Sequence, residues 1–260
     1  MKNNLPKIKF KNMDIDNVVE LLAWTVHEAD GPFPLSKFTY DMYPELKMVV
    51  NWGPDKIDDP DVVSLIKSTI SKRYDEYLAG NINLSDDYQK IWDEYNDNFM
   101  IALSERLNIS WPQDCNKITA GVGLIPIYPR YIKPRTFDIG KMDRKSVIET
   151  SMHECCHFLF FEKWKEIYQD WKWEEFDSPH IIWYLSEMLV DPILSCPEIQ
   201  TIFDGNFRAY DLFYDVKIDG NFMMKHISDI FKNNNIEDAI VKSYDYILAN
   251  EKTIREQCNG

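Results

Sequence analysis

The chain has 260 residues, a formal net charge of −14, and 45% hydrophobic and 28% charged residues. This length allows one large domain or two small ones around a substantial apolar core. The acidic excess argues against nucleic acid and anionic membranes as main partners, because the field of the protein repels both. No run of about 18 apolar residues occurs, so we expect no membrane-spanning helix.

The N-terminus and the cysteines favour a reduced, cytoplasmic protein. The opening MKNNLPKIKFKNM is basic, but no apolar run follows it, which argues against a secretory signal. The five cysteines are odd in number and irregularly spaced, which does not indicate a disulfide framework. The sequence carries no indication of the oligomeric state.

Residues 1–112 are expected to form a helical N-terminal region. Helices are predicted over residues 14–30, 60–80 and 85–109, from apolar residues at helical spacing. Gly31 and Pro32 are expected to end the first helix, and Gly80 the second.

The segment 117–140 is the one convincing β region. Ile118, Ala120 and Val122 alternate with other residues at period two, as in a half-buried strand. Prolines are typical of edge strands, and three follow, at 126, 129 and 134. The predicted fold class is therefore α+β and mainly α, with a small mixed sheet whose edge strand precedes the next helix.

Helical periodicity returns after Asp143, which can cap a helix over residues 144–170. In the next predicted helix, Ser178 suits the N-cap, Pro179 the first turn and Pro192 the end. Further helices are expected after it, including residues 235–252. Residues 113–260 are predicted to form the core domain, continuous with the N-terminal region or separate from it.

The first of these helices carries the motif H-E-x-x-H, written SMHECCHFLFF at residues 151–161. His153 and His157 are four residues apart, so both rings lie on one helix face and can bind one metal ion. Glu154 lies beside the water that such a metal would activate and can act as general base. The simpler alternative is a histidine pair with no metal, and Cys156, close to the same face, is more often a small buried residue than a ligand.

A third ligand is needed, and two downstream stretches of the form E-x-x-x-D offer one. Glu166 is predicted on the same helix as His157, nine residues on and so about 13 Å further along the axis. Glu187 lies on the separate helix after Ser178, where it belongs to a polar stripe on an otherwise apolar surface. A buried carboxylate must be paired or bind a metal, so Glu187 is the better candidate.

With H-E-C-C-H followed by E-M-L-V-D, the chain resembles the gluzincins, the thermolysin-like zincin metallopeptidases, and especially their small soluble members. The resemblance covers about residues 115–195. It implies a zincin-like core, one zinc ion held by His153, His157 and Glu187, and Glu154 as general base. It also implies that Asp191 accepts the N–H of His153, and that the strand around 120–124 is the edge strand that pairs with a peptide.

The family also uses a histidine or tyrosine to donate to the oxyanion of the tetrahedral intermediate. Tyr184 is the first candidate here, because it lies one turn before Glu187. The other candidates are His180, Tyr210, Tyr214 and His226.

The resulting hypothesis is a zinc metallopeptidase that acts on a peptide or protein. An alternative on the same fold is a zinc-stabilised module that binds a peptide without cleaving it, although Glu154 argues for turnover. A third hypothesis is a helical interaction protein with no metal, for which chelation would leave the melting temperature unchanged.

Overall fold

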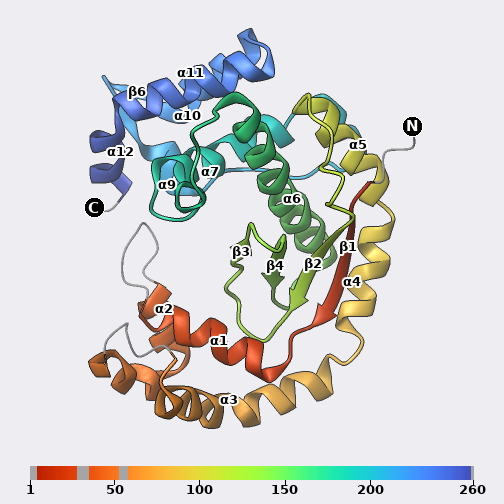
Figure 1. Ribbon diagram of the computed structural model, residues 1–260, viewed down its shortest axis with the longest axis vertical. Coiled ribbons are helices and arrows are strands. Elements are labelled where there is room, and N and C mark those ends of the chain that lie inside the picture. Colours follow the sequence, from red (N-terminus) through yellow and green to blue (C-terminus); the bar gives the residue numbers. More distant parts are fainter. Residues whose placement is uncertain (1–4, 28–34, 53–57, 259–260) are drawn as a thin grey trace.

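The computed structural model describes residues 5–27, 35–52 and 58–258. It is mainly helical with a small mixed sheet, so the predicted α+β class is confirmed (Figure 1). The predicted helix end at Gly31 and Pro32 lies outside the described residues.

Helices make up most of the structure. The N-terminal ones are α1 (Ile15–Thr25), α2 (Leu35–Met42), η1 (Pro44–Trp52), α3 (Pro60–Gly80), α4 (Leu84–Asp93) and α5 (Asn96–Arg106). The later ones are α6 (Arg144–Ile167), η3 (Trp173–Phe176), α7 (Ile181–Leu194), α8 (Pro197–Ile202), α9 (Asp211–Asp215), α10 (Met223–Asn233), α11 (Ile236–Ala249) and α12 (Glu251–Cys258). A two-stranded ribbon, β5 (Lys217–Ile218) and β6 (Asn221–Phe222), precedes α10.

The main sheet has the strand order β1-β2-β4-β3. Its strands are β1 (Lys7–Asn12), β2 (Lys117–Val122), β3 (Arg130–Tyr131) and β4 (Thr136–Ile139). β2 pairs in parallel with both β1 and β4, and β3 pairs antiparallel with β4. β2 is therefore an interior strand, and the prediction that it is the edge strand is wrong. The reason is that all three prolines follow Val122, so none removes a donor from its ladder.

The strand β1 has no counterpart among the predicted elements. In KIKFKN, Ile8 and Phe10 are buried while the three lysines that alternate with them face solvent, which is a period-two pattern. The buried side chain of Asn96 connects this strand to the helices. Its Oδ1 accepts from the backbone N–H of Ile8 at 3.3 Å and from Trp92 Nε1 at 2.8 Å. Its Nδ2 donates to the carbonyl of Pro6 at 3.1 Å.

Asn96 also begins α5, so the single helix predicted over 85–109 is divided into α4 and α5. Two apolar clusters account for the described core. The larger includes residues of β1, β2, β4 and α4 to α12, and the smaller joins α1, η1 and α3 to Ile125 and Ile127. The parallel pair of β1 and β2 thus spans the predicted boundary between residues 112 and 113.

The two helices predicted to carry the site pack against each other. α6 begins as expected, with Asp143 accepting the N–H of Ser146 at 2.8 Å. α7 begins later than predicted, because His180 rather than Ser178 caps it, with Nδ1 accepting the N–H of Ile182 at 3.2 Å. Pro192 lies inside the last turn of α7 instead of ending it. Its carbonyl accepts from Arg106 Nη2 at 2.9 Å.

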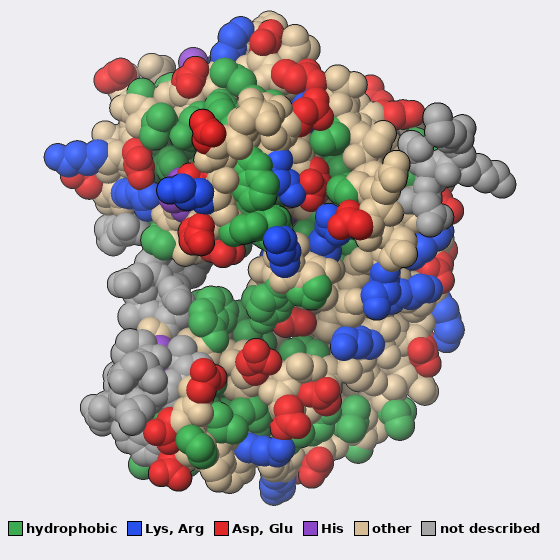
Figure 2. All heavy atoms as spheres, in the orientation of Figure 1, with side chains coloured by type: hydrophobic (Ala, Val, Ile, Leu, Met, Phe, Trp, Pro, Cys, Tyr) green, Lys and Arg blue, Asp and Glu red, His purple; other side chains and the backbone are tan. Residues whose placement is uncertain are grey.

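Figure 1 shows α1 to α3 on one side of the sheet and the C-terminal helices on the other. Figure 2 shows that the surface between these two groups is hollowed and exposes apolar side chains. The sheet forms the inner end of this cleft, so β3 and the segment before it lie between the two helical groups.

Candidate metal centre

The H-E-x-x-H histidines meet as the helical spacing predicts. His153 and His157 lie one turn apart on α6, with their Nε2 atoms 2.9 Å apart and their ring centroids separated by 4.6 Å. His157 is fully buried, whereas the side chain of His153 is 24% exposed. The pair therefore has one inner member and one that borders solvent.

Glu187 completes the group from α7. Its Oε2 lies 3.3 Å from the Nε2 atom of each histidine, and all three ligand atoms lie within 4.8 Å of one another. The three side chains therefore come together as predicted and could hold a metal ion. Glu166, the alternative in the sequence, instead pairs with Lys163 at 3.2 Å.

The spacing of these atoms fits a small divalent ion. Two ligands about 2.05 Å from a tetrahedral zinc ion are about 3.3 Å apart, close to the observed 2.9, 3.3 and 3.3 Å. Within the described part of the chain, the buried Oε2 of Glu187 accepts no hydrogen bond. Such an orphaned carboxylate oxygen is costly, and a cation between the three side chains would remove the cost.

The protonation states also suit ligation. Burial lowers the pKa of His157 to about 3, so its ring is neutral at pH 7 and one ring nitrogen has a lone pair to offer. Burial alone would raise the pKa of Glu187, but the neighbouring histidines and Arg130 hold it well below its usual value. Glu187 is therefore a carboxylate at pH 7.

Glu154 lies beside the group without belonging to it. It is 6% exposed, and its Oε1 is 4.0 Å from His153 Nε2. Burial raises its pKa, while the charges of His153 and Arg130 act in the opposite direction. A glutamate with a raised pKa next to a metal position suits proton transfer near neutral pH.

Arg130 is the component of the site that sequence reasoning missed. It comes from β3, and its Nη1 lies 3.4 Å from Glu187 Oε1 and 3.6 Å from Glu154 Oε2. Its side chain is 8% exposed, and the guanidinium lies over the ring of Phe161 at 5.6 Å. Arg130 thus holds the outer oxygen of Glu187, which leaves Oε2 facing the histidines. Nothing in its local sequence, YPRYIKP, distinguishes it from a surface arginine.

The structure directs Tyr184, the first candidate for the oxyanion donor, away from the histidines. Its side chain is fully buried, and the guanidinium of Arg255, on α12, lies 5.1 Å from its ring centre. Burial is the main cause that raises its pKa, followed by the charge of Cys258, and neither the histidines nor Glu187 is among the causes. One turn of α7 is enough to align Tyr184 roughly with Glu187, but not to point both side chains at one place.

Tyr210, which precedes α9, lies at the site instead. It lines one pocket together with His153 and Glu154. The negative charge of Glu187 is the largest cause that raises its pKa well above the usual value, followed by burial and Glu154. A tyrosine hydroxyl that stays protonated beside these groups is suited to donate a hydrogen bond.

The other candidates serve elsewhere. His180 caps α7, and the ring of His226 packs on Tyr246 at 4.3 Å. Tyr214 donates its hydroxyl to Oδ2 of Asp191, whose Oδ1 accepts from Ser195 Oγ at 2.9 Å. Both carboxylate oxygens of Asp191 therefore accept hydrogen bonds from hydroxyl groups. Among the described residues, no hydrogen bond joins His153 to Asp191, although the family resemblance implies one.

Cys155 and Cys156 are buried free thiols on α6. Burial raises the pKa of each of them, so both are protonated at neutral pH. A thiol in that state is a poor metal ligand, because the thiolate is the form that binds.

The pocket next to the group has a cavity volume of about 230 Å³. Tyr128, Phe207 and Tyr210 supply its apolar walls, and Glu149 and Arg208 are charged residues at its boundary. Because His153 and Glu154 also line it, a molecule in this pocket would lie against the candidate metal centre.

Comparisons with protein-family models, with curated proteins and with solved structures give no match for this chain. Among the residues that the structure describes, no helix combines the length and the apolarity needed to cross a bilayer. The case for a function therefore depends on the geometry of this centre.

Proposed function

We propose that the protein is a zinc-dependent metallopeptidase with a zincin-like core. The observation that carries the proposal is the convergence of His153, His157 and Glu187 beside the buried carboxylate of Glu154. Two imidazoles and one carboxylate are a ligand set that catalytic zinc uses, with a fourth position left for water.

His153, His157 and Glu187 would hold the zinc ion, which would supply Lewis acidity to activate water and polarise a carbonyl group. Glu154 accepts the proton of the attacking water and passes it to the leaving amine. Arg130 keeps Glu187 and Glu154 in place through its contacts at 3.4 and 3.6 Å. Tyr210 donates its hydroxyl to the oxyanion of the tetrahedral intermediate.

The sheet suggests how a peptide would be held. β3 is the last strand of the order β1-β2-β4-β3, so no other described strand pairs with its outer edge. An extended peptide can add to such an edge by backbone hydrogen bonds. Because Arg130 belongs to β3, a peptide bound along it would pass next to Glu154 and Glu187.

Two measurements test the proposal. Metal analysis of the purified protein, or titration of chelator-treated protein with zinc, should give one ion per chain. Digestion of a peptide library should show cleavage that a chelator abolishes. Glu154→Gln should retain the zinc and lose about 10²- to 10⁴-fold in rate. Failure to bind zinc would refute the proposal, whereas zinc binding without cleavage would leave the non-cleaving peptide-binding module.

A further inference from the structure

The pocket beside the candidate metal centre carries an acidic group that the proposed chemistry does not use. Glu149 lies on α6, one turn before His153, and its side chain is 23% exposed. It lines the same pocket as His153, Glu154 and Tyr210. Side chains one turn apart share a helix face, so Glu149 projects beside the proposed catalytic groups.

A hydrogen bond holds one carboxylate oxygen of Glu149 in place and leaves the other free to pair with a ligand. Its Oε1 accepts the backbone N–H of Asn206 at 2.6 Å and lies 3.6 Å from the ammonium of Lys145. The side chain of Lys145 is 58% exposed, so that ion pair is weak. Oε2 makes no hydrogen bond or ion pair with any residue that the structure describes.

The one arginine at the pocket is directed elsewhere. The guanidinium of Arg208 lies over the ring of Tyr214 at 4.0 Å, and its Nη2 is 3.3 Å from Asp211. Tyr128, Phe207 and Tyr210 give the pocket aromatic walls, and the polar residues Thr150 and Asn206 also line it. Aromatic walls with a carboxylate at one end suit a long apolar stem that ends in a cation.

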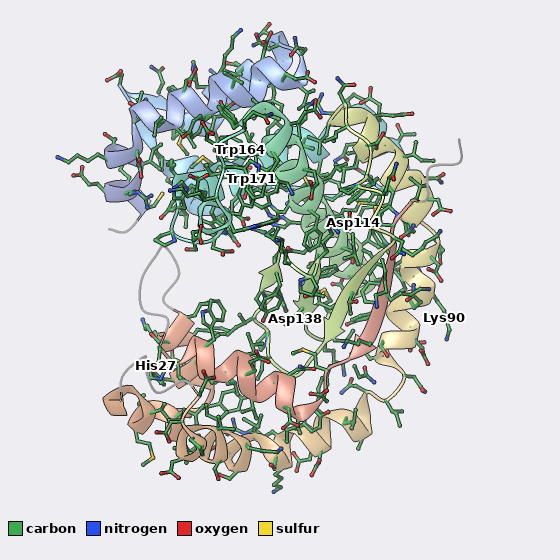
Figure 3. All side chains as sticks on the ribbon, viewed as in Figure 1. His27, Lys90, Asp114, Asp138, Trp164 and Trp171 are labelled. Atoms are coloured by element: carbon green, nitrogen blue, oxygen red, sulfur yellow. The ribbon has the colours of Figure 1, made fainter. Side chains whose placement is uncertain are left out.

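The surroundings of β3 are acidic as well. Figure 3 shows Asp138, on β4, at the side of the sheet that faces α1. Burial is the main cause that raises the pKa of Tyr131, on β3, and the charges of Asp138 and Glu20 raise it further. Glu20 and the net charge of −14 therefore give the surroundings of β3 a negative field, which a peptide along this strand would meet.

We propose that the pocket is a specificity site for a lysine or arginine side chain of the bound peptide, and that Glu149 pairs with its cation. The inference rests on the proposed function for the identity of the ligand as a peptide. It deepens that function by assigning the substrate class, which is peptides with a basic residue next to the peptide bond to be cleaved.

Binding tests this without turnover. The zinc-loaded full chain carrying Glu154→Gln is titrated with Ala-based, end-blocked hexapeptides that differ only at position three, as lysine, norleucine or glutamate. Dissociation constants come from the tryptophan fluorescence. The lysine peptide should bind about tenfold more tightly than the norleucine peptide, a difference of about 1.4 kcal/mol. The double variant Glu149→Gln, Glu154→Gln should bind the lysine and norleucine peptides equally. Glutamine at position 149 keeps an oxygen that accepts the N–H of Asn206 but lacks the negative charge.

Glu76→Gln is the matched control, because it removes one acidic charge from α3, where the side chain is 68% exposed. It should leave the tenfold ratio unchanged. Equal binding of the lysine and norleucine peptides, a ratio that survives Glu149→Gln, a preference for glutamate or no binding at all would each overturn the inference. A lysine preference that depends on Glu149, in a wild type that cleaves no peptide, would support the inference and refute only the peptidase proposal.

Discussion

Arg130 allows the sharpest test of the site, because it is buried between two acidic groups of the proposed machinery. Its Nη1 lies 3.4 Å from Glu187 and 3.6 Å from Glu154, and its side chain is 8% exposed. At an effective dielectric constant of about 20, a unit-charge pair at such a distance attracts by about 5 kcal/mol. Much of this offsets the cost of burying the charges, but removing one partner leaves the others uncompensated.

We therefore expect Arg130→Met to lower the free energy of unfolding of the metal-free protein by about 3–5 kcal/mol. Methionine retains much of the apolar stem, so the loss reports mainly on charge. Adding zinc should then stabilise the variant more than the wild type, because the ion supplies the positive charge that the two carboxylates lack. Urea unfolding with a chelator and then with zinc measures both quantities.

Arg135→Met is the control for this experiment. Arg135 lies just before β4, and its side chain is 21% exposed. It pairs with Asp114, which is 76% exposed, and with Glu162. Removal of such a surface pair should cost about 1 kcal/mol or less and should not change the response to zinc. A metal-free Arg130→Met protein within about 1 kcal/mol of the wild type would refute the claim that Arg130 neutralises the site.

Two further predictions concern the hydroxyl donor and pH. Tyr210→Phe should lower kcat by about 10²- to 10³-fold with zinc retained, while Tyr184→Phe should leave kcat within a few-fold; the reverse order would return the donor role to Tyr184. Burial raises the pKa of Asp138 from 3.8 to about 7, so the folded protein holds more protons in that window and its stability falls as pH rises from 4 to 7. Asp138→Asn should therefore stabilise the protein by about 2–4 kcal/mol at pH 8 and little at pH 4, as measured by urea unfolding; an equal effect at both pH values would contradict the assignment.

The parts of the site that could be predicted are those that helix geometry places close together. His153, Glu154 and His157 lie within five residues, and one turn of helix brings both rings to the same face whatever surrounds them. Glu187 required only that a second apolar helix pack against the first, since a buried acidic residue needs a partner.

The tyrosine proposed as oxyanion donor could not be predicted from spacing along one helix. Spacing along α7 aligns Tyr184 with Glu187, yet in the structure the ring of Tyr184 packs against Arg255 of α12. Tyr210 reaches the pocket from the segment before α9. No helical or strand periodicity in that segment predicts which way its side chains point. The position of β2 was misjudged for a related reason, because prolines after the strand say nothing about which strands lie beside it.

The sequence by itself determined the class of fold, the start of α6, the bounds of α3 and the face of α6 that carries both histidines, because these depend on contacts within about one or two turns of chain. The tertiary structure alone decided that β1 completes the sheet, that Arg130 lies between two glutamates and that Tyr210 lines the pocket. These residues come from segments separated by tens of residues, and only the packing of helices and strands into one core sets the distances between them.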